Sequence, residues 1–160
     1  MSHIKKYFLL AAGILIILFS VVFFSAQKEG VDVARTLASH QHIDLKVGNT
    51  VFDMAVSDTE SLRSMGLSGV AGLKNDEAML FVFPQEGLWG FWMKDMQFSI
   101  DIVWLDKEKK VVSFEKNVSP DTFPKTFFPK TNAMYVVEFI EGTVEKNKVH
   151  IGDQFVFPQK

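Results

Sequence analysis

The residues best suited to chemistry lie in and just after one aromatic stretch. The segment GFWMKDMQFSIDI, residues 90–102, places Lys94, Asp95 and Asp101 among tryptophan, phenylalanine, methionine and isoleucine. If this stretch is extended, Trp92 and Lys94 share a face. The indole ring could then stack on a ligand while the ammonium group fixes a carboxylate or phosphate. The pattern therefore predicts a binding site for a small polar ligand.

Two further carboxylates stand in strongly apolar runs, Asp101 in IDIVWLD and Glu138 in YVVEFI. Each must lie at an open end of the fold or be buried with a partner, because burying an unpaired carboxylate is very costly. The structural alternative pairs Lys94 with Asp95 or Asp101 in an ion pair between strands, with the aromatic residues as core. The candidate ligand-binding residues are Trp92, Lys94, Asp95, Asp101 and Glu138.

No residue is assigned a catalytic role, because the familiar catalytic patterns are absent. The chain has no P-loop, dinucleotide fingerprint, calcium loop or nucleophile elbow, and no cofactor is expected. His40 and His42 would share a face of an extended segment and could hold a metal together. No third ligand lies near them in the sequence, so no metal site is expected.

Residues 7–26, YFLLAAGILIILFSVVFFSA, form an uncharged run long enough to cross the hydrocarbon layer of a bilayer as a helix. A cleaved signal peptide would also fit, but Phe23 or Phe24 would fill the outer small-residue position of the cleavage site. Lys5 and Lys6 precede the run and hold the N-terminus in the cytoplasm. We expect a cytoplasmic N-terminus at 1–6, a transmembrane anchor or uncleaved signal at 7–26, a tether at 27–39, and a periplasmic or extracellular β domain at 40–160.

The charge and the absence of cysteine exclude some classes of binding partner and attachment. Two of the 17 basic residues precede the anchor and all 19 acidic residues follow it, so the exported part carries a formal net charge of −4. Nucleic acid is therefore not an expected partner, since its binding depends on clustered lysine and arginine. The sequence has no cysteine, so neither disulfides nor lipid attached to cysteine can stabilise or anchor the domain. The bilayer, contacted through residues 7–26, is the first expected partner.

Hydrophobic alternation and turn residues predict a mainly β domain with one or two short helices, α+β at the margin. Gly48-Asn49 joins the first two strands in a hairpin, and a short helix is expected from a capping box at Ser57 and Glu60 to Gly66. The expected strands are 42–47, 51–56, 79–83, 88–94, 100–106, 111–116, 133–140 and 154–157. The proline-bearing loop at 117–132 and a turn or short helix at 142–148 complete the list. We expect a compact antiparallel β-barrel or sandwich, preceded by a single N-terminal transmembrane helix.

Six ordered blocks of this sequence resemble one known family. They are GLSG at 66–69, MLFVF at 79–83, FWMKD at 91–95, the aspartate of SIDIVWLD, YVVE at 135–138 and IGD at 151–153. Over residues 66–157 the chain resembles the domain of unknown function 192 (DUF192) family, small β-rich domains often carried behind a signal or anchor. It departs from the family pattern at Val70, usually basic, at Ala78, usually glycine, and at Asp95-Met96, usually Asn-Thr. The resemblance implies a β-barrel-like fold and no established activity, and it adds weight to Trp92, Lys94, Asp101 and Glu138.

Three functions fit these observations. The first is a membrane-tethered extracytoplasmic module that binds a saccharide, a peptide or an anion, with the proline-bearing loop as one wall of its site. The second is a glycan hydrolase that uses two of Asp95, Asp101 and Glu138, about 5 to 10 Å apart, as acid and base. The third is an assembly domain whose exposed aromatic residues contact another protein of the cell envelope.

Overall fold

The computed structural model describes Leu37 and residues 40–158. All described residues belong to one compact unit, Leu37–Lys160. The expected N-terminus at 1–6, the anchor at 7–26 and most of the tether at 27–39 lie outside the described residues. Within the described part of the chain, no helix is both long enough and apolar enough to cross a membrane.

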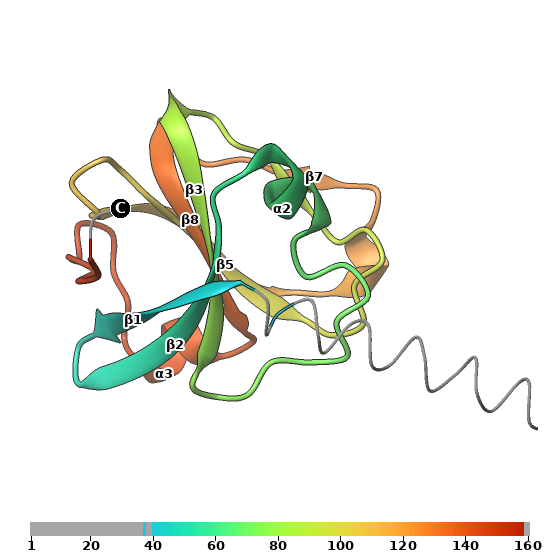
Figure 1. Cartoon of the computed structure of the whole chain (residues 1–160), viewed down its shortest axis with the longest axis horizontal. Helices are drawn as coiled ribbons and strands as arrows, with labels where there is room; N and C mark the ends of the chain where they lie inside the picture. Colours follow the sequence, from blue (N-terminus) through green and yellow to red (C-terminus); the bar gives the residue numbers. More distant parts are fainter. Residues whose placement is uncertain (1–36, 38–39, 159–160) are drawn as a thin grey trace, which may run out of the picture. The chain divides into compact units, whose positions relative to one another are not determined.

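A six-stranded mixed sheet forms the body of the domain (Figure 1). Its strands, in spatial order, are β1 (Gln41–Val47), β2 (Thr50–Ser57), β3 (Glu77–Gly87), β8 (Ala133–Ile140), β5 (Ile100–Leu105) and β6 (Val111–Val118). A two-stranded sheet pairs β4 (Phe91–Trp92) with β7 (Thr126–Phe127). The short helices are α2 (Glu60–Met65) and α3 (Thr143–Lys146), and a 3₁₀ turn, η1, covers Pro120–Thr122. The mainly β prediction is confirmed.

The expected antiparallel barrel or sandwich is corrected to a mixed sheet, because β2 and β3 run parallel while the other neighbours are antiparallel. A parallel pair needs a crossover connection of a dozen or more residues, usually with a helix. Residues 58–76 provide that connection and include α2. We call residues 58–76 the crossover segment. The sequence did contain a signal for the parallel pair, because the predicted helix lies between the predicted strands 51–56 and 79–83.

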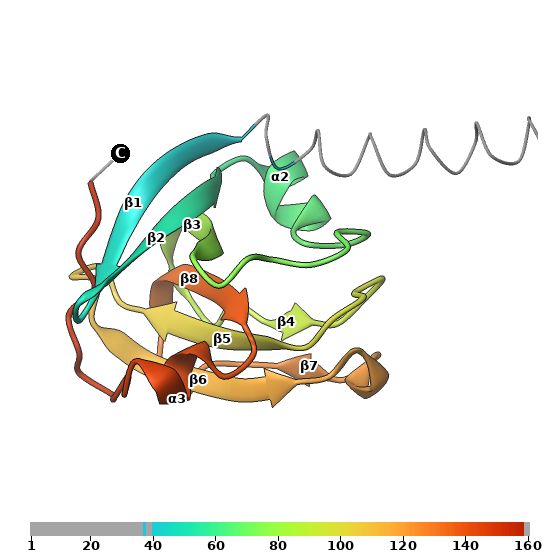
Figure 2. The same ribbon diagram turned by 90° about the horizontal axis from the view of Figure 1, so that it is seen from below.

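The described strands form no closed barrel, because the edge strands β1 and β6 do not pair with each other. The C-terminal residues 154–157, expected as a strand, make only two single bridges, Lys46 to Val156 and Lys110 to Gln154. Phe155 and Phe157 are nevertheless buried, so this segment covers the apolar interior beside β1 (Figure 2). Burial of alternate side chains produced the strand signal without a continuous ladder of hydrogen bonds.

Helix α2 begins later than the capping-box pattern predicts. Thr59 is its N-cap and accepts a hydrogen bond from the backbone N–H of Leu62, while Ser57 is the buried last residue of β2. Gly66 ends the helix at φ 50°, a left-handed conformation that glycine adopts without a Cβ clash. No residue of α2 is fully buried, and only Leu62 and Arg63 are partly buried, so this short helix depends on few contacts with the sheet.

The two faces of the large sheet have different roles. One face, which includes Leu80, Val137 and Phe139, packs in the main hydrophobic core with Val144 of α3. The opposite face carries Phe81, Trp104 and Glu138 on β3, β5 and β8, as the strand registers require. In Figures 1 and 2, α2 and the short strands lie toward one end of the domain and α3 lies away from them. The second face is therefore the one that the crossover segment and β4 cover.

Candidate functional site

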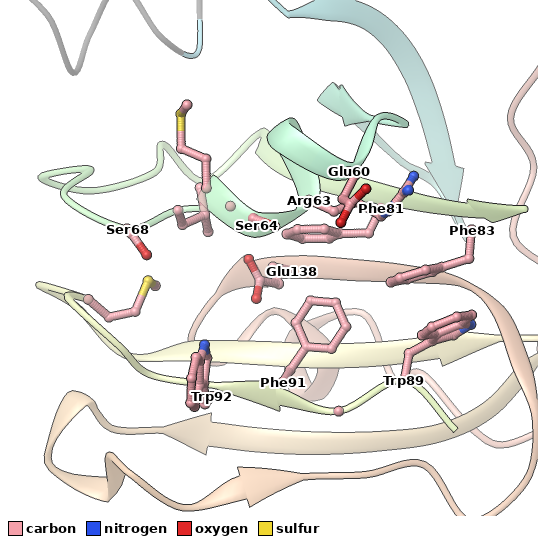
Figure 3. A pocket seen from close by; sticks show the side chains of 15 residues that line it. Glu60, Arg63, Ser64, Ser68, Phe81, Phe83, Trp89, Phe91, Trp92 and Glu138 are labelled. Atoms are coloured by element: carbon pink, nitrogen blue, oxygen red, sulfur yellow. The ribbon is translucent and has the colours of Figure 1, made fainter. Parts of the chain in front are cut away.

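A pocket of about 270 Å³ opens between the crossover segment and β4 (Figure 3). The crossover segment contributes Glu60 and residues 63–68, and β3 contributes Phe81 and Phe83. Residues 89–92, Met96 and the single β8 residue Glu138 complete the lining. Four segments distant in sequence therefore meet at one concavity. Its lining combines aromatic rings with five polar or charged side chains, those of Glu60, Arg63, Ser64, Ser68 and Glu138.

Glu138 lies at the centre of this pocket and is 4% exposed. In the strand ladder it stands opposite Met79 of β3 and Ile102 of β5, both fully buried apolar residues. Its Oε2 atom has no hydrogen-bond partner, and its side chain forms no ion pair with any described residue. Burial raises the pKa of Glu138 to about 8, because removal from water disfavours the charged carboxylate. At neutral pH this group is mainly a carboxylic acid.

Aromatic rings form the walls around Glu138. The rings of Phe81 and Phe91 meet nearly at right angles, with centroids 4.8 Å apart, and make a corner. Phe83 and Trp89 stack in parallel with centroids 4.1 Å apart. Trp92 is 54% exposed and stands at the edge of the pocket, where its ring contacts Phe123 at 5.8 Å. Figure 3 shows Phe81, Phe91 and Trp92 around the carboxyl group of Glu138.

The wall that carries Trp92 is held by the pairing of strand β4 with strand β7. Phe91 and Trp92 pair with Phe127 and Thr126 of β7, which holds this part of the chain beside the larger sheet. The buried indole of Trp104 donates a hydrogen bond of 2.8 Å to the backbone oxygen of Trp89. The aromatic wall is therefore tied both to β7 and to β5.

Arg63 attaches α2 to the sheet. One guanidinium nitrogen donates to the backbone oxygens of Asp58, at 2.6 Å, and Val82, at 2.8 Å. The guanidinium carbon lies 5.3 Å from the centre of the Phe83 ring, a cation–π distance. One end of the Arg63 guanidinium group is therefore bonded to carbonyl oxygens of the protein. Glu60 and Ser64, on the same helix, are exposed and stand at the rim.

Lys94 and Asp95 do not belong to the pocket lining. Strand β4 ends at Trp92, so the extended face expected to unite Trp92 with Lys94 does not form. The two residues occupy an exposed turn in which Asp95 has φ 56°. The backbone oxygen of Lys94 accepts from the Ser68 hydroxyl at 3.0 Å, and that of Asp95 accepts from the Gly69 N–H at 2.9 Å. Their backbones thus hold the end of the crossover segment near the pocket.

The ion pair proposed as a structural alternative for Lys94 is absent from the described residues. Asp101 has backbone partners instead. Its Oδ1 accepts from the N–H of Asn117 and its Oδ2 from the N–H of Val144, both at 2.8 Å, and the residue is completely buried. This carboxylate ties β5 to the end of β6 and to α3. Of the five candidate residues, the fold brings only Trp92 and Glu138 together in the pocket.

Comparison with known proteins places this domain in a family. The family model DUF192, described as Uncharacterized ACR, matches residues 42–157. The chain belongs to the DUF192 family. A search of curated proteins finds no match.

Two solved structures share the DUF192 fold of this chain. One, from Sinorhizobium meliloti 1021, is described as a candidate transcription regulator; it is 21% identical, with a TM-score of 0.67 over 72% of this chain and 92% of that one. The other is a protein of unknown function from Novosphingobium aromaticivorans, 19% identical, with a TM-score of 0.66 over 72% of this chain and 83% of that one. At these identities the similarity establishes the fold and no activity.

Several pocket residues of this DUF192 domain were not predicted from the sequence. Phe81 and Phe83 come from the MLFVF block, and Arg63 and Met65 come from α2. The alternation of Met79, Phe81 and Phe83 was a usable signal, because all three share the face of Glu138. Which face of that strand borders a pocket depends on the parallel pairing of β2 and β3, which was missed. The proline-bearing loop does not line the pocket but supports its wall from behind, through the pairing of β7 with β4 and the contact of Phe123 with Trp92.

The histidines of the DUF192 domain have local partners. The Nδ1 atom of His42 lies 2.8 Å from a carboxylate oxygen of Asp53, and its Nε2 atom lies 3.1 Å from the backbone oxygen of Leu37. Among the described residues, no three or more histidine, aspartate or glutamate side chains gather in a group that could hold a metal ion.

Proposed function

We propose that this DUF192 protein is a membrane-tethered, extracytoplasmic module that binds a small ligand. The observation that carries the proposal is a buried carboxyl group without a partner, Glu138, facing a pocket with aromatic walls. Ligand sites are typically concave and mostly apolar, with a few polar groups that orient the ligand. The pocket volume of about 270 Å³ is small and suits a ligand about the size of one ring.

The composition of the lining favours binding over the hydrolase hypothesis. A glycosidase of the expected kind needs two carboxyl groups that face the same substrate. Neither Asp95 nor Asp101 lines the pocket, and the second carboxylate that does, Glu60, is exposed at the rim. The lining thus offers one buried carboxyl group, which can orient a ligand but has no facing partner of its own kind.

An assembly role is the second candidate, because large apolar side chains are exposed near the pocket. Trp92 and Phe123 contact each other while each is about half exposed, and exposed Phe128 lies close to Gly90 in the lining. A protein partner would cover these residues together, whereas a small ligand would contact Trp92 alone. Replacing Phe123 and Phe128 with serine should remove a co-purifying envelope protein if the domain assembles through this surface.

Thermal unfolding of the full-length chain, purified in a non-ionic detergent, tests the binding proposal. A ligand that binds only the folded state raises the unfolding temperature in proportion to the logarithm of its concentration. The screen should contain matched amines, alcohols, saccharides, short peptides and carboxylates. We expect at least one class to stabilise the wild type.

A matched pair of variants shows whether the effect comes from the pocket. Ser64→Phe adds a ring at the rim of the pocket, and Ser61→Phe adds the same ring on an exposed position of α2 outside the lining. Ser64→Phe should abolish the stabilisation and Ser61→Phe should retain it. Equal responses of the two variants would contradict the proposed site.

The tether is tested separately by cell fractionation. The apolar run at residues 7–26 supports a membrane location, so the full-length chain should sediment with membranes and resist extraction by high salt. A chain that lacks residues 1–26 should lose this association. Recovery of the full-length chain in the soluble cytoplasmic fraction would overturn the proposed location.

A further inference from the structure

We propose that the ligand carries a primary ammonium group on a short apolar or aromatic body, and that Glu138 is the anionic partner of that group. This inference rests on the proposed binding function and narrows it to one ligand class. Three features of the pocket carry it. The carboxyl group of Glu138 has no hydrogen-bond partner at Oε2, aromatic rings surround it, and it forms no ion pair with a described lysine or arginine.

The carboxyl group of Glu138 lacks compensation from the protein. It is 4% exposed, its Oε2 has no hydrogen-bond partner, and its flanking residues Met79 and Ile102 are apolar and fully buried. A buried charge becomes favourable when it is paired and hydrogen-bonded. An ammonium group supplies both a positive charge and three N–H donors. It would therefore provide what the surrounding residues do not.

The aromatic walls suit the body of such a ligand. Phe81 and Phe91 form a corner beside Glu138, and Trp92 lies on the other side of the carboxyl group (Figure 3). The electron-rich faces of aromatic rings attract cations, and their area accepts an apolar ligand body. An ammonium group at Glu138 with a ring or short alkyl chain behind it would contact both kinds of surface.

An anionic ligand finds a single cation in the lining, and that cation already bonds the protein through one of its nitrogens. Arg63 is the only lysine or arginine among the lining residues, and one of its nitrogens is bonded to the backbone oxygens of Asp58 and Val82. Lys94 does not line the pocket. An anion beside Glu138 would disfavour ionisation of that carboxyl group and would bring no N–H donor to its Oε2 atom. A carboxylate or phosphate therefore matches Glu138 less well than an ammonium group does.

A saccharide finds too few polar partners. Apart from Glu138 and Glu60, the polar side chains of the lining are those of Ser64, Ser68, Arg63, Trp89 and Trp92. The hydroxyl of Ser68 already donates to the backbone oxygen of Lys94, and one nitrogen of Arg63 donates to two backbone oxygens. A sugar enclosed here would leave several hydroxyl groups without hydrogen bonds, which weakens binding. One ammonium group requires fewer partners and finds an acceptor without a partner in Glu138.

Isothermal titration of the full-length chain in non-ionic detergent tests the inference with three probes of nearly equal shape. They are phenethylamine, 2-phenylethanol and 3-phenylpropionate, which carry a positive, a neutral and a negative group on the same aryl-ethyl body. We expect the amine to bind at least about tenfold more tightly than the alcohol and the carboxylate to bind more weakly than both. Glu138→Gln should remove the preference for the amine, and Glu115→Gln, the same change at an exposed residue of β6, should retain it.

Proton release gives a second readout that nonspecific binding of an amine would not produce. An ammonium group next to Glu138 stabilises its ionised form, so binding near pH 7 should release up to about one proton per ligand. Titration in two buffers with different ionisation enthalpies measures this number. Glu138→Gln should release none.

The outcomes separate this inference from the proposed function. If the alcohol or a saccharide binds at least as tightly as the amine, and Ser64→Phe abolishes that binding, the ammonium inference is overturned and the binding function stands. If the amine binds equally well to wild type, Glu138→Gln and Ser64→Phe, the ammonium inference is also overturned. If no amine, alcohol, saccharide, peptide or carboxylate binds the wild type, both proposals are overturned.

Discussion

Asp101 and Glu138 lie one step apart on the neighbouring strands β5 and β8, and their carboxyl groups point to opposite faces of the sheet. The register sets Asp101 opposite Phe139 and Ile102 opposite Glu138, and successive residues of a strand alternate between faces. Asp101 accepts two backbone hydrogen bonds on its face, whereas Glu138 has none on the other. Two buried carboxyl groups in adjacent strands therefore have separate roles, which the following experiments can distinguish.

The carboxylate of Asp101 should contribute to stability and not to ligand binding. Asp101→Asn replaces one accepting oxygen with an NH₂ group, which faces the N–H of Asn117 or Val144 as a second donor. We expect the free energy of unfolding, measured in urea, to fall by about 1 to 3 kcal/mol. Asp44→Asn, on the exposed face of β1, should change it by less than about 0.5 kcal/mol. A stable Asp101→Asn variant with altered ligand affinity would assign Asp101 to the site instead.

Glu138 should make the stability of the domain depend on pH. Burial raises its pKa from 4.5 to about 8, so the folded state holds this proton over a pH range in which the unfolded chain has lost it. The free energy of unfolding should therefore fall as pH rises from 4.5 to about 8, by at most about 1.4 kcal/mol per pH unit from this group. Below and above that range, Glu138 should contribute no slope.

Glu138→Gln tests this assignment, because glutamine does not titrate. Urea unfolding measured at intervals between pH 5 and pH 9 should show a smaller slope for this variant than for the wild type, while Glu115→Gln should keep the wild-type slope. An unchanged slope in Glu138→Gln would mean that the pH dependence comes from other groups.

The contacts of Arg63 should determine whether α2 stays against the sheet. Lysine keeps the positive charge but lacks the planar guanidinium that reaches both carbonyl oxygens and lies over the Phe83 ring. In Arg63→Lys, we expect the amide protons of α2 to exchange with solvent about tenfold faster, while those of β5 remain protected. Ligand affinity should fall as well, because α2 forms one wall of the pocket. Uniform acceleration in both elements would indicate global destabilisation instead.

Gly90 should tolerate no side chain. A Cβ atom at this position would lie 2.5 Å from Cε1 of Phe128 and 2.7 Å from Cγ2 of Thr126, so β7 and the Phe128 ring would have to move. We expect Gly90→Ala to lower the free energy of unfolding by about 1 to 3 kcal/mol. Gly72→Ala is the matched control, because no atom lies within 4 Å of its added Cβ. Chemical denaturation of both variants would measure the difference, and equal stability would contradict the close packing of β4 on β7.

Local signals in the sequence predicted much of the framework. The hairpin at Gly48-Asn49 and the strand at 133–140 were correctly located, because turn chemistry and a long apolar run are recorded in adjacent residues. The parallel pairing of β2 with β3 was missed, since it depends on contacts between segments separated by the crossover segment. Strand β4 is much shorter than expected because the chain turns at Lys94 and Asp95.

The same distinction applies to the site. Trp92 and Glu138 stood out because an aromatic residue beside charged ones and a carboxylate within an apolar strand are visible in the sequence itself. Phe81 could not be placed beside Glu138 until β3 was known to pair with β8. Asp101 looks similar to Glu138 in sequence, and only the hydrogen bonds of its two oxygens separate their roles.

The crossover segment joins two parallel strands and also forms one side of the pocket. The same residues that make the parallel pairing possible therefore also contact a bound ligand. None of the residues of α2 is buried, and exchanging those that do not anchor it removes little apolar contact from the interior. Substitutions at the exposed α2 positions that line the pocket, Glu60 and Ser64, can therefore alter ligand selectivity while the six-stranded sheet keeps its pairing.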